Sequence, residues 1–326
     1  MELIKVSVYN LSGNDLMDTA FDIDGINLNQ TYDIRGNPLF DSGVHILPNH
    51  SSGTSSGYSF RFSSMDYSYP LFDVVDFLAD SNSYQSFVYN PDKNQFYKFD
   101  ASTTVKIYNS TFQKISTVTL PTSAGHTGDA CYYDGKIFFP ADIDFNQNTL
   151  PVWDIENNTM DFLPVIGVPT PESPVEYRAM GGICNVPNEP GLLYLVYADR
   201  LNNAVEHDPK EKFLIYKYDI STHEAEQMGE YTWDCVYLQG SVIIDGILYA
   251  ACNSPTTGSP SNYTGITLRA FRTDTWEELQ PLTLNGTLEP EGMDAYPYNE
   301  GEIMMGIGHY GSLSKATRFS APYKLI

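Results

Sequence analysis

Acidic side chains stand at or just before the start of several similar apolar segments, and they are the residues of this chain that could do chemistry. Asp129, Asp234 and Glu291 occupy three such places. Carboxylates gathered around one pocket could act as general acid and base. Beside histidine and arginine, the same groups can instead hold a sugar in a pocket.

The candidate ligand-binding set is wider than these three carboxylates. It comprises His126, Asp129, Arg178, Trp233, Glu291, Asp294, His309 and Tyr310, with Gln85, Asp234 and Glu289 in comparable places. The alternative is that these side chains line a water-filled channel, which is polar without binding anything. His309 stands alone, and a lone histidine more often has a structural role. The sequence holds no HExxH, GxSxG, Walker loop or Cys-His nucleophile pattern.

One run of oxygen-bearing side chains at alternate positions is a candidate metal site. It consists of Asp142, Asp144, Asn146 and Asn148. Calcium loops use this spacing to point several oxygens at one cation. Gln147 stands where such loops need glycine, and Trp153 stands where they need an acidic residue. We therefore expect a polar surface loop and no cofactor, with calcium binding as the alternative.

The elements that must position these residues are copies of one hairpin. The clearest copy spans 128–139, where two short apolar strands flank Asp134-Gly135, a dipeptide that strongly favours a hairpin turn. Looser copies span 86–99, 182–197, 240–250 and 292–307, and successive starts are 42, 54, 58 and 52 residues apart. That spacing is typical of a four-stranded propeller blade with variable loops.

A second pair of strands is expected after four of the hairpins, at 105–120, 150–165, 213–228 and 267–282. After the last hairpin only one further strand is expected, at 316–323. We predict an all-β chain with a β-propeller over 81–326, most simply of five blades with four antiparallel strands each, or six if residues 40–80 supply another. A strand from residues 1–80 should complete the last blade, because ring closure removes an exposed edge.

Residues 1–80 depart from the repeat and form an irregular, β-rich segment for attachment and closure. Strand-like patterns occur at 3–9, 19–23, 43–47 and 58–62, while 71–78 fits either a short helix or a buried strand. The first residues lack the basic region and continuous apolar stretch of a signal peptide. We therefore expect a protein made in a cytoplasm without an export signal.

The composition excludes some partners. The net charge of −23, from 41 acidic and 18 basic residues, repels phosphate backbones and anionic lipid surfaces, so we expect neither nucleic acid nor membrane as a partner. The 24 tyrosines and 17 phenylalanines are mostly explained by packing between sheets.

The cysteines lie in or beside apolar strands and outside any CxxC, so we expect small buried apolar residues, with a disulfide as the alternative. They are Cys131, Cys184, Cys235 and Cys252.

The segment Gly125-His126-Thr127-Gly128-Asp129-Ala130, with the aromatic strand and Asp-Gly turn that follow, resembles a unit of five-bladed propeller domains in bacteriophage tail receptor-binding proteins. The resemblance is one of architecture over about 245 residues, and only this copy carries the histidine. It implies a trimeric or multivalent tip protein that binds cell-surface glycans. It also implies that residues 1–80 dock onto the virion.

We therefore expect a non-enzymatic structural or binding protein of a phage-like virion. It would be a homo-oligomeric tail or tail-fibre component that binds a host surface glycan or another virion protein. Five-bladed furanosidases and fructosidases also resemble the chain in blade number and channel carboxylates, so a glycoside hydrolase using Asp129, Asp234 and Glu291 is the enzymatic alternative. A scaffold that joins proteins through its acidic rim is a further alternative, and fold analogy does not choose among the three.

Overall fold

The structure is a computed structural model, and its chain forms two compact units, Met1–Ser68 and Tyr69–Ile326. The residues that it describes are 22–23, 26–27, 45–49, 59–63, 73–75, 84–100, 103–123, 127–140, 148–172, 175, 177–200, 211–232, 235–256, 259–285, 289–298, 301–309, 312–321 and 323. Among these residues, none belongs to a helix long and apolar enough to cross a membrane.

In the first unit, the described residues form two antiparallel strand pairs. β1 (Asp22–Ile23) pairs with β2 (Ile26–Asn27), and β3 (His45–Asn49) pairs with β4 (Ser59–Ser63). These strands overlap parts of the strand-like patterns expected at residues 19–23, 43–47 and 58–62. The other strand expected there, at 3–9, lies outside the described residues.

In the second unit, the described strands form five antiparallel sheets of four strands each, which we number first to fifth along the chain. The first sheet contains β6 (Tyr84–Asn90), β7 (Gln95–Asp100), β8 (Thr104–Asn109) and β9 (Lys114–Thr119). The second contains β10 (Cys131–Tyr133), β11 (Lys136–Phe138), β12 (Thr149–Asp154) and β13 (Thr159–Pro164). The third contains β14 (Tyr177–Asn185), β15 (Leu192–Arg200), β16 (Lys212–Asp219) and β17 (Ala225–Thr232).

The fourth sheet contains β18 (Val236–Ile244), β19 (Ile247–Thr256), β20 (Ser259–Arg272) and β21 (Leu282–Asn285). The fifth contains β22 (Glu289–Ala295), β23 (Glu302–His309), β24 (Ser312–Ser320) and β5 (Asp73–Val75). In the first four sheets, each strand pairs with the next one along the chain.

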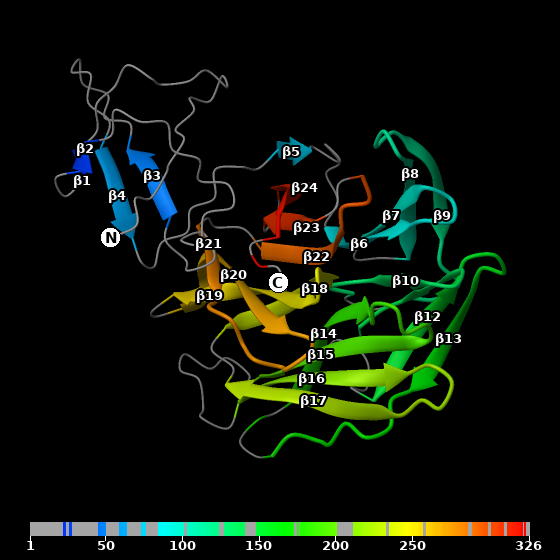
Figure 1. Ribbon diagram of the computed structural model, residues 1–326. Coiled ribbons are helices and arrows are strands. Elements are labelled where there is room, and N and C mark those ends of the chain that lie inside the picture. The colour runs from blue at the N-terminus through cyan, green and yellow to red at the C-terminus, as the bar shows by residue number, and fades with distance from the viewer. Residues whose placement is uncertain are drawn as a thin grey trace. The chain divides into compact units, whose positions relative to one another are not determined.

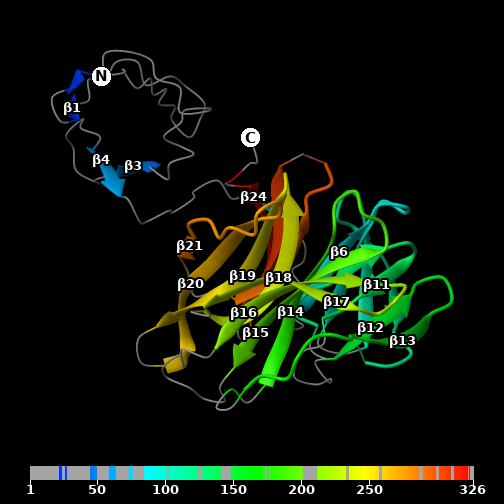
Figure 2. The same ribbon diagram turned by 60° about the horizontal axis from the view of Figure 1, so that its bottom comes forward.

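The first strand of each sheet lies toward the centre of the second unit. β6 lies against β10, β10 against β14, β14 against β18, β18 against β22, and β22 against β6 again. Each sheet then continues outward, so the colours in Figures 1 and 2 change in steps from cyan to red around the assembly. This is an all-β propeller fold with blades of antiparallel strands, as the spacing of the hairpins predicted.

The short strand β5 completes the fifth sheet. It pairs antiparallel with β24, with Asp73 opposite Arg318 and Val75 opposite Ala316. The sequence predicted that a strand from residues 1–80 would fill this place, and β5 does so. Residues 73–75, in the segment that fitted either a helix or a strand, are therefore a strand, and they cover an edge of β24 that would otherwise be open.

The hairpin turns form as their sequence predicts. Asp134 and Gly135 both have positive φ, 47° and 76°, which is the backbone of a primed two-residue turn. Asp245 and Gly246 repeat it in the fourth sheet, with φ of 48° and 75°. Such turns match the twist of the paired strands, so they set the register of each hairpin.

Glycines at the start of two hairpins allow neighbouring inner strands to approach each other closely. Gly240 in β18 has φ of +122°, and a Cβ there would lie 2.9 Å from Cγ of Met293 in β22. Gly292 has φ of +89°, and a Cβ there would lie 3.2 Å from Cα of Ser86 in β6. The ladder is irregular at these points, because register shifts interrupt β18 and β22 beside their glycines.

The core lies between adjacent sheets and is rich in aromatic rings. Trp153 of the second sheet is buried against Tyr97 and Phe99 of the first, with ring centroids 5.9 and 6.3 Å apart. For two of the cysteines the alternative holds, because Cys235, directly before β18, and Cys252 in β19 form a disulfide and are not simply buried apolar side chains. Cys131 and Cys184 are buried free thiols, as expected. Burial raises the pKa of both of these thiols well above the ordinary cysteine range.

Candidate functional site

Asp129 is held at the centre of the second unit by hydrogen bonds from three other sheets. Its side chain is 0% exposed. Its Oδ2 accepts hydrogen bonds from the backbone N–H of Ile183 in β14 and of Ser241 in β18, both at 2.8 Å. Its Oδ1 accepts one from the N–H of Met293 in β22 at 3.2 Å. The Asp129 carboxylate therefore joins the innermost strands of the third, fourth and fifth sheets.

This surrounding has two opposite effects on the Asp129 pKa. Burial raises it well above the usual aspartate value, and it is the larger effect. The backbone donors, which stabilise the charged form, lower it in part. Next to Asp129, the hydroxyls of Thr127 and Ser86 form a hydrogen bond of 2.9 Å that connects this centre to β6. The expected place for Asp129 was an open channel mouth, whereas the structure encloses its carboxylate among backbone donors.

Asp294 makes a comparable connection between the last and first sheets. Its Oδ2 accepts a hydrogen bond from the backbone N–H of Tyr89 in β6 at 2.8 Å, and its Oδ1 accepts one from Ala295 at 2.7 Å. Loss of solvent around this carboxyl raises its pKa to about 7. Glu291 and Gln85 are also buried, in β22 and β6 respectively. Asp294 thus contributes to the contact between β22 and β6.

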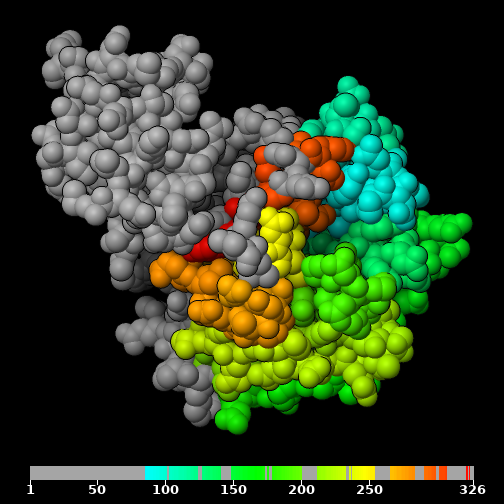
Figure 3. Space-filling model, in the orientation of Figure 1, coloured from blue at the N-terminus to red at the C-terminus, as the bar shows by residue number. Residues whose placement is uncertain are grey.

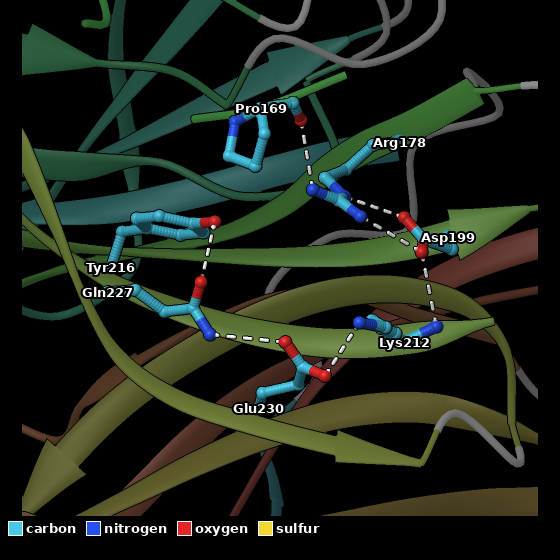
Figure 4. Close-up of polar contacts among 7 residues, drawn as sticks. All are labelled: Pro169, Arg178, Asp199, Lys212, Tyr216, Gln227 and Glu230. Carbon is cyan, nitrogen blue, oxygen red and sulfur yellow. Dashed lines mark hydrogen bonds and ion pairs between the residues drawn. The ribbon is translucent and has the colours of Figure 1, made fainter. Parts of the chain in front are cut away.

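Arg178 forms a buried ion pair within the third sheet (Figure 4). It stands directly opposite Asp199 in the pairing of β14 with β15. Its Nε and Nη2 donate to Oδ1 and Oδ2 of Asp199 at 2.6 and 3.0 Å, and its Nη1 donates to the carbonyl of Pro169 at 2.9 Å. Arg178 and Asp199 are 6% and 1% exposed. All three nitrogens of the guanidinium therefore have partners, and a bidentate pair of this kind fixes geometry strongly.

The polar contacts of Arg178 continue across the same sheet to its outer strand. The backbone N–H of Lys212 donates to Oδ2 of Asp199 at 3.2 Å, and its Nζ lies 2.7 Å from Oε1 of Glu230. Glu230 also accepts from Gln227, which in turn accepts from the hydroxyl of Tyr216. The hydrogen bond from Lys212 is the largest cause of a lowered Glu230 pKa. Figure 4 shows these contacts as one chain that runs from Arg178 in β14 to β17 and turns back to Tyr216, so they link the strands of the sheet and do not converge on a common point.

The other predicted site residues are only partly covered by the structure. His126, Trp233, Asp234, Tyr310, Asp142, Asp144 and Asn146 lie outside the described residues. His309 belongs to β23 and Glu289 to β22, and only the backbone of these two residues is described. Within the part that the structure covers, no three histidine, cysteine, aspartate or glutamate side chains gather closely enough to hold a metal ion.

The structure also brings together residues that the sequence analysis did not select. Asp199 was missed, although a carboxylate near the end of a buried strand is a signal for a charged partner. An aromatic cluster was missed as well, and it joins Tyr89, Phe96 and Phe112 of the first sheet to Tyr296 and Tyr298 of the fifth. The signal available for it was the Tyr-Pro-Tyr sequence at 296–298, directly after an inner strand.

Comparisons with known proteins give no functional assignment. No protein-family model matches the chain, and no curated protein sequence matches it. A solved structure described as "Structure of U3-55K" aligns with 72% of this chain and 77% of its own, with a TM-score of 0.42 and 8% sequence identity. Likeness at that level carries no argument, so the propeller assignment stands on the strand pairing itself.

Proposed function

We propose that this chain is a non-enzymatic binding propeller, in which a closed ring of five blades presents surface residues to a glycan or a protein. We further propose that it serves as a tail or tail-fibre component of a phage-like particle and works as a homo-oligomer. Residues 1–80 would attach it to other virion proteins, while β5 from the same segment completes the ring. The phage setting is supported by the resemblance of the segment 125–130 and its hairpin to tail receptor-binding propellers.

The observation that carries the non-enzymatic proposal is the burial of Asp129. A hydrolytic acid or nucleophile must reach the bond that it cleaves, within hydrogen-bond distance or through one water. The Asp129 side chain is 0% exposed, and both of its oxygens accept hydrogen bonds from backbone N–H groups of other sheets. A carboxylate in that position supports the fold, and it is poorly placed to meet a substrate.

A second consideration concerns Arg178, the basic residue of the predicted sugar site. Its guanidinium is occupied by Asp199 and by the carbonyl of Pro169. Binding a ligand through Arg178 would therefore leave Asp199 buried without its partner, which is costly. Both observations favour a binding surface elsewhere on the propeller over a channel that uses these two residues.

The test compares binding with hydrolysis for the purified full chain. Binding to whole bacterial cells and to a glycan array is measured alongside sugar release from arabinan and fructan polymers. We expect binding without release. Release of sugar that is abolished by Glu291→Gln, in a variant that retains the wild-type melting temperature, would instead establish the hydrolase.

A further inference from the structure

Five aromatic rings form a cluster across the seam between the first and fifth sheets, which we call the Tyr298 cluster. It consists of Tyr89, Phe96, Phe112, Tyr296 and Tyr298. The ring centroids of Phe96 lie 5.0 Å from those of Tyr89 and Phe112 and 6.3 Å from that of Tyr298, which lies 5.6 Å from Tyr296. Figure 3 shows the cyan first sheet directly beside the orange segment of the fifth sheet, where this seam reaches the surface.

The cluster has a buried base and an exposed upper ring. Phe96 is buried at 2% exposure, whereas Tyr298 is 45% exposed. Tyr89, Phe112 and Tyr296 are partly buried between these extremes. An exposed ring supported from below by other rings offers a flat apolar face at a small cost in side-chain entropy.

Two tyrosine hydroxyls hold the polar edge of the cluster in place. Tyr298 and Tyr89 both donate to Oδ1 of Asn94, at 2.7 and 2.9 Å. Asn94 lies in the turn between β6 and β7 with φ of 51°. Since its oxygen is occupied by these donors, its amide nitrogen is directed elsewhere, and within the described residues that nitrogen has no hydrogen-bond partner.

A hydrogen-bond acceptor lies in the same turn. One oxygen of Asp92 accepts a hydrogen bond from the hydroxyl of Tyr132 in the second sheet. The other oxygen has no partner among the described residues, and the Asp92 side chain is exposed. Counting only the described residues, the turn therefore combines an amide donor at Asn94 and a carboxylate acceptor at Asp92 that have no partner, beside the exposed ring of Tyr298.

These groups fit a saccharide better than other ligands. A sugar ring has one face of C–H groups that can lie on an aromatic ring, and its hydroxyls both donate and accept hydrogen bonds. The acidic Asp92 and the net charge of −23 disfavour sialylated or phosphorylated sugars, because like charges repel. A neutral saccharide can match all three groups of the protein, which are a flat apolar ring, a hydrogen-bond donor and a hydrogen-bond acceptor.

From this arrangement we infer that the Tyr298 cluster, with Asn94 and Asp92, is a binding site for a neutral saccharide. The ring of Tyr298 supports the C–H face of one sugar unit, while the Asn94 amide and the Asp92 carboxylate bind its hydroxyls. This inference rests on the proposed binding function and names the site and ligand class for it.

The experiment screens the purified full chain against neutral oligosaccharides of glucose, galactose, mannose and N-acetylglucosamine, together with their sialylated counterparts. The best neutral binder is then titrated calorimetrically against variants. Tyr298→Ala should weaken binding by about tenfold or more because the stacking face is lost. Tyr298→Phe keeps the ring and loses one hydroxyl bond, so it should weaken binding by about threefold or less.

Phe162→Ala is the matched control, because Phe162 on β13 is also 45% exposed and lies in the second sheet. Its affinity should stay within about twofold of the wild type, since Phe162 belongs to a different sheet and is not part of the Tyr298 cluster. If Phe162→Ala weakens binding as strongly as Tyr298→Ala, or if Tyr298→Ala binds as well as the wild type, the site inference is overturned while the binding function stands.

Two further outcomes separate the site from the function. If no saccharide binds but Tyr298→Ala abolishes capture of a second copy or of a virion protein, the cluster is a protein contact, and only the saccharide assignment fails. If no saccharide binds and the chain releases sugar from a polymer, the proposed function fails together with the inference.

Discussion

The hydrogen bonds of Asp129 allow a quantitative prediction about how the sheets are held together. The perturbation is Asp129→Ala, which removes the acceptor for the backbone N–H groups of Ile183, Ser241 and Met293. These groups belong to three different sheets, and the Asp129 side chain that serves them is 0% exposed. The variant therefore leaves three enclosed donors without an acceptor at one point.

The magnitude follows from the cost of each abandoned donor. A buried donor without an acceptor costs about 1–3 kcal/mol, so three of them cost about 3–9 kcal/mol before any relaxation. Entry of a water molecule into the space would recover part of this, which leads us to expect about 5 kcal/mol. Because whole domains are stable by only about 5–15 kcal/mol, Asp129→Ala should bring the chain close to unfolding.

Asp129→Asn keeps the fold measurable if the alanine variant does not. Its single oxygen can serve the two donors that now share Oδ2, while its NH₂ group must face the remaining donor of Met293. We expect a loss of about 2–4 kcal/mol in the free energy of unfolding, measured by urea denaturation. Asp161→Asn on the exposed strand β13 is the control and should change stability by less than about 0.5 kcal/mol.

Hydrogen exchange followed by mass spectrometry tests the location of the effect. In Asp129→Asn, amide protection should fall most in peptides that contain Ile183, Ser241 and Met293, although these lie 54, 112 and 164 residues from the substitution. The reasoning is refuted if the variant is as stable as the wild type. It is also refuted if protection is lost only in the peptide that contains residue 129.

Three further predictions concern other buried groups. Arg178→Met should destabilise the chain by about 3–5 kcal/mol in urea denaturation, because it leaves Asp199 buried without its cation. The double variant Arg178→Met with Asp199→Leu should recover part of that loss. Equal stability of the single variant and the wild type would contradict this prediction. The Asp294 pKa is raised to about 7, so the stability that its neutral form contributes is fully present below about pH 4 and is lost as pH rises through 7. The free energy of unfolding of the wild type relative to Asp294→Asn should therefore fall by about 2–4 kcal/mol between pH 4 and 8. A difference that does not change with pH would show that Asp294 does not titrate in this range. Gly240→Ala would place a Cβ 2.9 Å from Cγ of Met293 in β22, so it should lower the free energy of unfolding by about 2–4 kcal/mol. Gly135→Ala is the control and should cost about 1 kcal/mol, because nothing lies within 4 Å of its Cβ. Similar costs for the two variants would rule out close approach as the reason for glycine at position 240.

The fold was largely predictable because a propeller blade is made of local pairings. The dipeptide Asp134-Gly135 and the apolar residues around it predict the hairpin β10–β11, and looser copies of the pattern recur in the other sheets. The missing strand of the last blade predicted a donor from residues 1–80, which the structure identifies as β5. These inferences use either residues close in sequence or the number of strands. Neither kind of information depends on side-chain contacts between sheets.

The chemical roles of individual residues were less predictable. Asp129 and Arg178 were expected to face a common channel because each lies near the start of an inner strand. A strand alternates its side chains between two faces, so the same starting position directs one residue to the centre and another to a neighbour within its sheet. The cysteines illustrate the same limit, because the sequence separation of 17 between Cys235 and Cys252 does not predict that the hairpin β18–β19 brings them together.

The sequence alone therefore determined the repeated hairpins, their turns, the glycines of the inner strands and the all-β propeller. Tertiary structure decided which polar groups meet, namely Asp129 with three distant inner strands, Arg178 with Asp199, and Tyr298 with Asn94, 204 residues away. The physical reason is that backbone pairing within a sheet follows from local pattern and turn geometry. The partners of a buried or clustered side chain depend instead on how closely separate sheets approach one another.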